Sequence, residues 1–211
     1  MPKFIDDNVY YIEYARAYFE KTSALDSSFF LTPFISNLDT NSFVLDLGCG
    51  SGRDLLLLKT MGFRSIGFER SSVLAQMARD HSGCPVVEGD FETYDFSSLR
   101  VNALLFSAAL VHLPHTRVKS VLDNALYALD GHGMVYVSLK EGNGVSFDGD
   151  LRRFFLWKDD DLRKIFSELG LVVVDFRSTR SVRGIDETWL SYTLYFDKNK
   201  PLFRYPDRLI L

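Results

Sequence analysis

Short apolar runs alternate with helix-like segments along the chain from residue 42 onward. Alternation of this kind is typical of α/β proteins, in which helices join the parallel strands of an open sheet. The apolar runs predict parallel strands at residues 42–47, 65–68, 85–88, 101–107 and 134–139. Apolar residues at helical spacing predict helices at residues 53–61, 71–79, 116–129 and 158–169.

The pattern changes toward the carboxyl end of the chain. Residues 171–176 and 189–196 both have the composition of strands, and no helical pattern separates them. Two strands without a crossover helix between them are expected to pair antiparallel. The sequence therefore predicts an α/β fold with a mostly parallel sheet that ends in an antiparallel hairpin.

A further helix is predicted at residues 7–21, ahead of the sheet. Tyr10, Tyr14 and Tyr18 follow one another at intervals of four residues and so share one helix face. Two interpretations of this stripe stay open: it packs on the sheet as ordinary core, or its hydroxyls reach a polar edge such as that of a bound ligand. In either case we expect residues 1–38 to form a helical cover.

Composition narrows the class of protein. The 211 residues are 46% hydrophobic and 25% charged, which suits one globular domain with a buried core. The net charge is −4, so no overall basic field attracts nucleic acid. Cys49 and Cys84 lack paired spacing, which excludes a disulfide scaffold and a cysteine-rich zinc site. We expect a cytoplasmic protein without a membrane span, a secretory signal or a metal site.

Aromatic residues are distributed unevenly. Residues 35–150 hold 10 of the 30 Phe, Tyr and Trp residues, and the remaining 20 fall within the 95 positions at the two ends. A larger core at the ends would account for this difference. Aromatic walls around a bound ligand would account for it equally well.

The most informative motif is the glycine-rich segment VLDLGCGSGRD at residues 44–54. Glycines after a strand let the backbone approach a ligand, and the helix that follows offers free N–H donors. Dinucleotide-binding loops have the spacing GxGxxG, which would require a glycine where this chain has Arg53. That difference disfavours a nicotinamide-dependent oxidoreductase. The spacing GxGxG, with Asp46 two residues before the first glycine, resembles motif I of the class I S-adenosylmethionine-dependent methyltransferases.

Other segments resemble the same family in the order in which the family has them. They are IGFER with Glu69, VVEGDFETYDF with Asp90, LLFSAALVHLP after the fourth strand and GHGMVYVSLKEG at the fifth. The resemblance covers residues 10 to 198 and implies a Rossmann-like seven-stranded sheet with helices on both faces. It also implies S-adenosylmethionine as the cofactor, with ribose hydroxyls at Glu69 and adenine beside Asp90 and Phe91. The cofactor-binding residues expected from it are Tyr14, Tyr18, Asp46, Gly48, Gly50, Gly52, Arg53, Glu69, Arg70, Asp90, Phe91, Ser107 and Ala108.

Arg53 is unusual for its position in the first turn of a helix. The helix dipole opposes a cation there, whereas it favours the neighbouring Asp54. We expect an anionic partner for Arg53, such as the carboxylate of the cofactor or a neighbouring acid, with a solvated arginine as the alternative.

The segment after the fourth strand bears on the methyl acceptor. Residues 107–110 are Ser-Ala-Ala-Leu rather than the NPPY-like tetrapeptide of enzymes that methylate nucleic-acid amines. With the acidic net charge, this favours a small-molecule acceptor over a nucleic acid. His112 is the candidate base or substrate-positioning group, although it equally suits a cap of the turn before Pro114. A nucleic-acid methyltransferase and a non-catalytic S-adenosylmethionine-binding module remain as alternatives.

Residues 140–157 form the other candidate acceptor segment. The resemblance implies that Lys140, Arg153 and Phe155 face the acceptor, whereas a solvated connection is the plainer interpretation. Arg177, Arg180 and Arg183 have no acid among residues 176–185, so they form either a solvated loop or a patch that attracts an anionic acceptor. The expected organisation is one domain, with the cover at 1–38, the cofactor core at 42–139, the acceptor side at 140–198 and a tail at 199–211.

Overall fold

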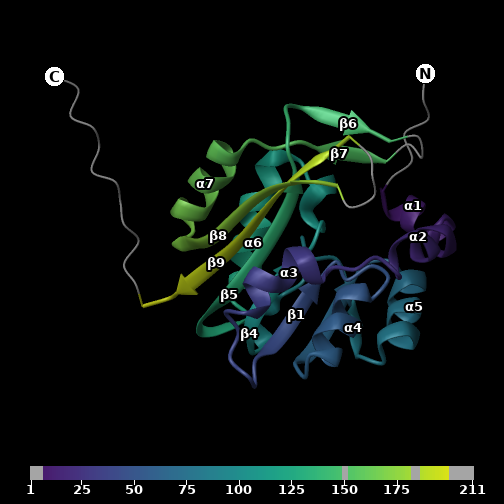
Figure 1. Cartoon of the computed structure of the whole chain (residues 1–211), viewed down its shortest axis with the longest axis horizontal. Coiled ribbons are helices and arrows are strands. Elements are labelled where there is room, and N and C mark those ends of the chain that lie inside the picture. Colours follow the sequence, from purple (N-terminus) through teal and green to yellow (C-terminus); the bar gives the residue numbers. More distant parts are fainter. Residues whose placement is uncertain (1–6, 149–151, 182–185, 200–211) are drawn as a thin grey trace.

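The computed structural model describes residues 7–148, 152–181 and 186–199. In these ranges the strands form a seven-stranded sheet in the order β3-β2-β1-β4-β5-β9-β8, and two further strands form a small hairpin (Figure 1). Strands β1 to β5 are parallel, while β9 runs antiparallel to both β5 and β8. The Rossmann-like sheet with an antiparallel end that the sequence predicts is therefore confirmed.

The strand bounds extend several of the predicted runs. The sheet consists of β1 (Phe43–Leu47), β2 (Arg64–Glu69), β3 (Val86–Glu88), β4 (Val101–Phe106), β5 (Leu129–Lys140), β8 (Leu171–Arg180) and β9 (Thr188–Asp197). The hairpin consists of β6 (Val145–Phe147) and β7 (Arg153–Phe155). The sequence predicted only a loop in the region of this hairpin.

Helices lie before and between the strands. They are α1 (Asp7–Glu13), α2 (Ala15–Thr22), α3 (Ser28–Ile35), α4 (Arg53–Thr60), α5 (Ser72–Ser82), α6 (His115–Leu126) and α7 (Asp159–Glu168), with short 3-10 turns η1 (Phe96–Ser98) and η2 (Leu110–His112). None of the helices in these ranges is long and apolar enough to cross a membrane.

Alternate residues of the central strands pack on opposite faces of the sheet. On one face, Ala103 and Leu105 of β4 join a cluster with Leu31 and Phe34 of α3. On the other face, Leu104 of β4 joins a larger cluster with α6 and α7. Because strand side chains point alternately up and down, buried residues on both faces require helices on both faces.

The N-terminal helix differs from the prediction. Residues 7–21 were expected as one helix, but α1 ends at Glu13 and α2 begins at Ala15. Tyr14 stands between them with φ −107° and ψ 18°, outside helical geometry. The two helices contact α5 beside the carboxyl ends of the parallel strands (Figure 1).

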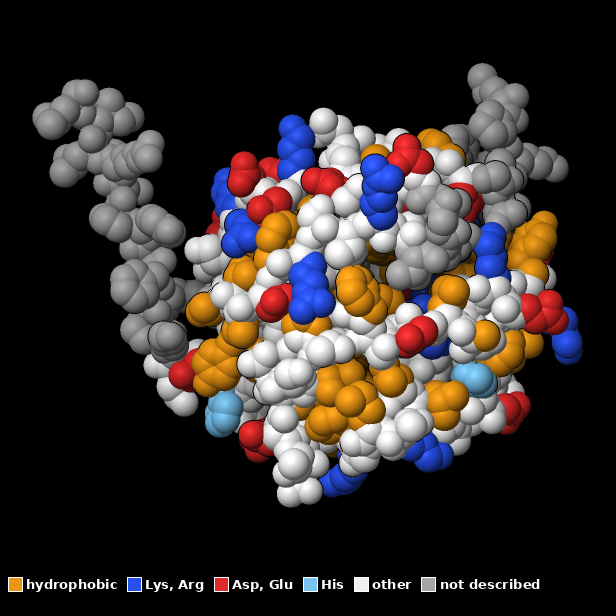
Figure 2. Space-filling model, in the orientation of Figure 1, with side chains coloured by type: hydrophobic (Ala, Val, Ile, Leu, Met, Phe, Trp, Pro, Cys, Tyr) orange, Lys and Arg blue, Asp and Glu red, His pale blue; other side chains and the backbone are white. Residues whose placement is uncertain are grey.

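Charged side chains of both signs are interspersed on the face shown in Figure 2. This matches the modest net charge of −4, and no single-sign field dominates that face. The expected tail at 199–211, apart from Asn199, and the first six residues of the expected cover lie outside the described residues.

Candidate active site

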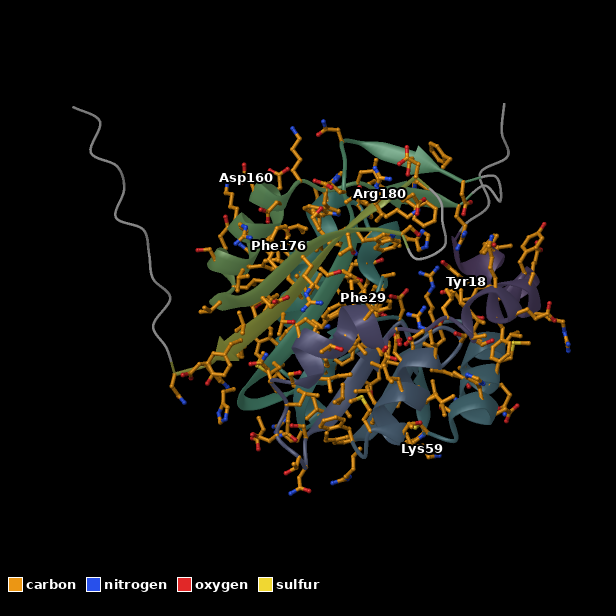
Figure 3. All side chains as sticks on the ribbon, viewed as in Figure 1. Tyr18, Phe29, Lys59, Asp160, Phe176 and Arg180 are labelled. Carbon is orange, nitrogen blue, oxygen red and sulfur yellow. The ribbon has the colours of Figure 1, made fainter. Side chains whose placement is uncertain are left out.

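The carboxyl ends of β1 and β4 lie next to each other in the sheet. The helix after β1, α4, packs on one face of the sheet, and the helix after β4, α6, packs on the other. In open α/β sheets ligands bind at such a switch point, where the loops after the strands separate. A cavity of about 500 Å³ lies here, lined by the ends of β1, β2 and β4 and by α1 and α2. Tyr18 and Arg180 lie at this end of the molecule and Lys59 at the opposite end (Figure 3).

The glycine loop after β1 lies close against two other segments. Gly48 has φ +73°, and a Cβ there would come within 2.8 Å of Ala109 Cβ in the loop after β4. Gly50 has φ +53°, and its Cβ would meet the Tyr18 ring at 3.3 Å. Both glycines line the cavity. A side chain at either position would fill a cradle that an elongated ligand needs, so the loop fits the expected cofactor.

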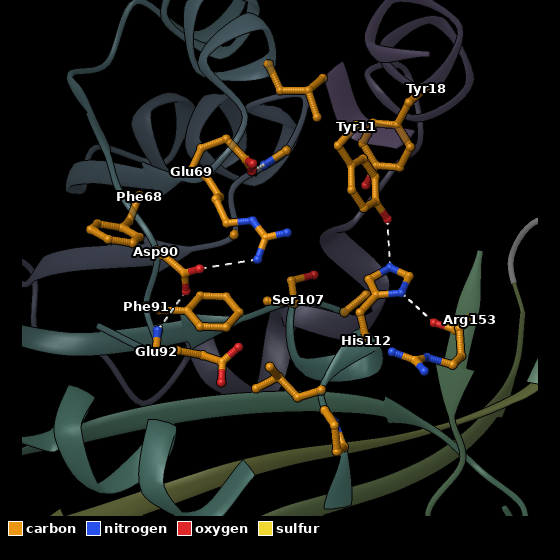
Figure 4. A pocket seen from close by; sticks show the side chains of 18 residues that line it. Tyr11, Tyr18, Phe68, Glu69, Asp90, Phe91, Glu92, Ser107, His112 and Arg153 are labelled. Carbon is orange, nitrogen blue, oxygen red and sulfur yellow. Dashed lines mark hydrogen bonds and ion pairs between the residues drawn. The ribbon is translucent and has the colours of Figure 1, made fainter. Parts of the chain in front are cut away.

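Glu69 ends β2 and faces the same cavity (Figure 4). Only 8% of its surface is exposed. Its Oε2 atom accepts a hydrogen bond from the Gly50 amide and its Oε1 atom accepts one from the Ser71 amide, each at 2.9 Å. Burial raises the pKa of Glu69, and the backbone donors oppose that rise. The carboxylate is thus fixed in orientation, and each oxygen keeps a lone pair for a diol.

The loop after β3 forms the far wall of the cavity. Asp90 accepts a hydrogen bond from the Glu92 amide at 2.9 Å and pairs with Arg70 at 3.2 Å (Figure 4). Phe91 lines the cavity beside them. The expected residues Glu69, Arg70, Asp90 and Phe91 therefore surround one space, although they come from two different loops.

His112 is held by hydrogen bonds to both ring nitrogens (Figure 4). Nδ1 lies 2.6 Å from the carbonyl oxygen of Arg153, and Nε2 lies 2.8 Å from the hydroxyl of Tyr11. A carbonyl only accepts, so Nδ1 carries the hydrogen, and in the neutral ring Nε2 accepts from Tyr11. Burial raises the pKa of Tyr11, so its hydroxyl keeps its proton and can donate it.

A second, smaller cavity of about 150 Å³ lies beside the first. Five residues line both cavities and so form a shared wall: Tyr11, Tyr18, Gly48, Ser107 and Ala108. The second cavity is otherwise enclosed by α2, α3, β5, β7 and the facing ends of β8 and β9.

Ala108 occupies the shared wall in a strained conformation. It has φ +57°, and it is the only non-glycine residue with positive φ in the described part of the chain. Its amide donates to the Ser138 hydroxyl at 2.9 Å, which holds it in place. Such strain in a non-glycine residue is concentrated at functional sites, and here it brings the backbone of the β4 loop against both cavities.

Arg53 has the neighbouring acid as its partner. Its guanidinium makes two hydrogen bonds to the Asp54 carboxylate, at 2.8 and 2.9 Å, and a longer one of 3.4 Å to the Ser107 hydroxyl. The pair lines the second cavity rather than the first. The Asp54 pair compensates the cation at the helix N-terminus, which was one of the partners expected.

Several expected site residues lie outside both cavity linings. Tyr14 is 46% exposed on the far side of Tyr10, on which its ring stacks. Asp46 is 1% exposed beneath the glycine loop, with Oδ2 lacking a hydrogen bond, and burial together with Asp54 raises its pKa. Gly52 faces α5 instead, and Phe155 packs beside His115.

Neighbours in sequence take the places of two expected residues. Tyr11 lines both cavities where Tyr14 was expected, and Tyr14 lies at the break between α1 and α2. Phe154 lines the second cavity where Phe155 was expected, because alternate strand residues face opposite sides. The signal for Tyr11 was its spacing from Tyr18, because residues seven positions apart share one face of a helix.

The basic residues of the acceptor segments are divided between the two cavities. Lys140 lines the second cavity and Arg153 the first, while Arg152, which the sequence did not suggest, lines the second. Arg180 also lines the second cavity. Arg177 instead pairs with Asp175 at 3.2 Å, and Arg183 lies outside the described residues.

Comparison with known proteins identifies the domain. Residues 44–133 match the family model described as a methyltransferase domain. No match was found among the curated proteins.

Solved structures share the fold at low sequence identity. A 1,6-didemethyltoxoflavin-N1-methyltransferase from Burkholderia thailandensis has a TM-score of 0.69 and 17% identity, covering 89% of this chain and 84% of that one. Magnesium protoporphyrin IX methyltransferase from Synechocystis PCC 6803 has a TM-score of 0.65 and 14% identity, covering 92% and 99%. A glycopeptide N-methyltransferase has a TM-score of 0.64 and 14% identity, covering 83% and 98%. The comparisons thus show a methyltransferase domain at residues 44–133 and, over most of the chain, the fold of these solved methyltransferases.

Proposed function

We propose that the protein transfers a methyl group from S-adenosylmethionine to a small-molecule acceptor that occupies the second cavity. The observation that carries this proposal is the shared wall of Tyr11, Tyr18, Gly48, Ser107 and Ala108 between the two cavities. Methyl transfer is an in-line displacement, so donor and acceptor must meet across a short gap from which water is excluded. Two adjoining cavities of unequal size meet that requirement.

The larger cavity is proposed for the cofactor, which supplies an electrophilic methyl group on a sulfonium when bound. Glu69 accepts from the ribose hydroxyls, Asp90 and Phe91 border the adenine, and Arg70 holds Asp90 in place. Gly48 and Gly50 leave room for the chain that carries the sulfur. Asp46 is buried beneath the glycine loop and lies outside the lining of the cavity, so it supports the loop rather than the ligand.

The shared wall is proposed to support the transfer in two ways. The faces of Tyr11 and Tyr18 attract a cation by their ring quadrupoles, which favours the sulfonium in the cavity. Where the acceptor loses a proton, that proton passes to the Tyr11 oxygen as the Tyr11 hydrogen moves to His112 Nε2. His112 then carries both ring hydrogens, with Nδ1–H still donating to the Arg153 carbonyl.

In this proposal the ends of the chain select the acceptor and the middle holds the cofactor. Residues 1–38 and 140–198 supply Tyr11, Tyr18, Lys140, Arg152 and Phe154 to the second cavity. Two of the structural neighbours are named for small molecules, 1,6-didemethyltoxoflavin and magnesium protoporphyrin IX, which supports a small-molecule acceptor rather than a macromolecule. The net charge of −4 weighs against a nucleic-acid acceptor.

Transfer of a radiolabelled methyl group from S-adenosylmethionine to a fractionated cell extract tests the proposal. We expect label in the ultrafiltrate that contains small molecules, and its appearance there should resist nuclease and protease. Label confined to RNA, DNA or protein would contradict the proposal, and the absence of label from every fraction would favour a non-catalytic binding module. Heat-inactivated protein provides the control for chemical methylation.

A further inference from the structure

The second cavity brings together basic and aromatic side chains. Lys140 and Arg152 line it, and they are only 5% and 4% exposed. Phe154 and Trp189 line it as well, with the Lys140 ammonium 3.5 Å from the centre of the Phe154 ring and 5.7 Å from that of Trp189. Burying two cations in one small space is unfavourable unless anions accompany them.

Each cation has a carboxylate partner that lies outside the lining of the cavity. Lys140 forms an ion pair with Glu187, and Arg152 forms one with Asp148. Neither carboxylate lines the cavity, whereas both cations do. Asp54 is the only acid among the cavity-lining residues described, and Arg53 already holds it with two hydrogen bonds. The surface presented to a ligand is therefore basic.

One buried polar atom in the lining of the second cavity, Arg152 Nε, lacks a hydrogen bond among the described residues. A buried polar group without a partner costs about 1–3 kcal/mol. Arg152 Nε can only donate, so an oxygen of a ligand would satisfy it.

We propose that the methyl acceptor is a small aromatic carboxylate, whose carboxylate is bound by Lys140 and Arg152. This inference rests on the proposed function. The ring lies beside Phe154 and Trp189, and the atom to be methylated lies at the shared wall next to Tyr11 and Ala108. A cavity of about 150 Å³ suits a single ring, since an engineered cavity of that size in another protein binds benzene.

Calorimetry with two simple probes tests the charge of the ligand. Benzoate and benzamide have nearly the same shape, but only benzoate carries a negative charge. Each is titrated into the full protein saturated with S-adenosylhomocysteine. We expect benzoate to bind at least tenfold more tightly than benzamide, because only benzoate places a negative charge on the cavity side of the two cations, where charge-assisted hydrogen bonds can form.

Variants of Lys140 test the location of the site. Lys140→Met should weaken benzoate binding at least tenfold, while Lys140→Arg should keep most of it. Neither should change the affinity for S-adenosylhomocysteine by more than about twofold. Lys119→Met is the matched control, because Lys119 also pairs with a glutamate, Glu168 at 2.7 Å, but lies on the exposed surface of α6. It should leave benzoate binding unchanged.

The outcomes separate the inference from the proposed function. Equal affinity for the two probes, or no binding of benzoate while S-adenosylhomocysteine binds, overturns the inference alone. Lys140→Met weakening S-adenosylhomocysteine instead of benzoate also overturns it, because the anion at Lys140 would then be the carboxylate of the cofactor. If the wild-type protein does not bind S-adenosylhomocysteine, the proposed function fails and the inference fails with it.

Discussion

At the end of β2, the Glu69 carboxylate accepts hydrogen bonds from two segments, the glycine loop and the residue before α5. Both of its oxygens are used, so the side chain is locked while it faces the larger cavity. Tyr11 is similarly fixed, because its hydroxyl donates to His112 and accepts from Arg152 at 3.4 Å. Each of these side chains can therefore be tested by a substitution that removes one or two atoms.

Glu69→Gln replaces one carboxylate oxygen with an amide group that donates. Either the Gly50 or the Ser71 amide would lose its hydrogen-bond acceptor. The ribose hydroxyls would lose a charged acceptor. Hydrogen bonds to charged groups contribute about 1.5–3 kcal/mol, so we expect S-adenosylhomocysteine to bind roughly ten- to a hundredfold more weakly by calorimetry. Glu88→Gln is the control, because Glu88 lies nearby on β3 but pairs with Arg79 at the surface. Equal effects of both substitutions would contradict the proposed role.

The pH dependence of cofactor binding follows from the same carboxylate. Burial raises the pKa of Glu69, so the side chain takes up a proton at a higher pH than an ordinary glutamate, whose pKa is about 4.3. Protonation removes acceptor capacity, so the affinity for S-adenosylhomocysteine should fall as the pH is lowered toward that raised pKa. Calorimetry at a series of pH values should show a weaker fall for Glu69→Gln. An identical fall in both proteins would assign it to another carboxylate, such as the buried Asp46.

Tyr11→Phe removes the hydroxyl that contacts His112 and leaves the ring in the shared wall. We expect methyl transfer to slow by at least about tenfold, because a positioned proton acceptor contributes about a hundredfold or more. The affinity for S-adenosylhomocysteine should stay within twofold, since the ring is kept. The measurements are single-turnover rates and calorimetry. Tyr14→Phe should change neither quantity, and an equal loss in that variant would remove the proposed role of Tyr11.

At the level of elements, the glycine loop fixes the distance between α4 and α5. Gly52 caps the start of α4 with φ +75°, and a Cβ at this position would lie 2.9 Å from Ala78 Cα and from its carbonyl oxygen. The third glycine of the motif is therefore required by helix packing rather than by the cavity. The α1–α2 pair acts at the same scale, because it carries Tyr11 and Tyr18, which both line the cavities.

Gly52→Ala should destabilise the fold in two ways. Positive φ costs a residue with a Cβ about 1–2 kcal/mol, and forcing α4 away from α5 costs about 1–3 kcal/mol more. We expect the free energy of unfolding in urea to fall by the sum of these two amounts. Gly62→Ala is the matched control, because Gly62 has φ +88° but nothing within 4 Å of its Cβ. It should lose only the first amount, and equal losses in the two variants would contradict the packing argument.

At the scale of the whole molecule, the strand order creates the site. β1 lies between β2 and β4, so the loops after β1, β2, β3 and β4 converge at one end of the sheet. The α1–α2 pair covers this end (Figure 1), and Phe154 of β7 and the facing ends of β8 and β9 complete the second cavity. Ligand binding should therefore stabilise distant parts of the chain together.

Thermal unfolding measures that stabilisation. A ligand at a hundred times its dissociation constant adds about 2.7 kcal/mol to the folded state. For a chain of this size we expect S-adenosylhomocysteine to raise the melting temperature by roughly 5–10 °C. Reduced nicotinamide dinucleotide should cause no shift, because Arg53 stands where its loop requires glycine. A shift with the dinucleotide alone would revive the oxidoreductase interpretation.

The sequence by itself determined the succession of β1 to β5 along the chain, the antiparallel end of the sheet and the glycine loop, while the resemblance of its motifs associated Glu69, Asp90 and Phe91 with that loop. These features follow from local patterns, because hydrophobic period, turn glycines and motif spacing act over a few residues. A change of conformation at one residue defeats such patterns. Tyr14 interrupts a continuous tyrosine stripe, and the alternation in β7 exchanges Phe155 for Phe154.

Only the tertiary structure decided which side chains meet at the two cavities. Tyr11 lies 101 residues from His112 in the sequence and 141 from Arg152, yet its hydroxyl contacts both. Lys140 gains its buried position and its partner Glu187 from the pairing of β5 with β9. These contacts depend on strand order and helix docking, which the burial of apolar surface over the whole chain selects. Local periodicity holds no information about these long-range contacts. The basic second cavity is therefore visible only in the folded molecule.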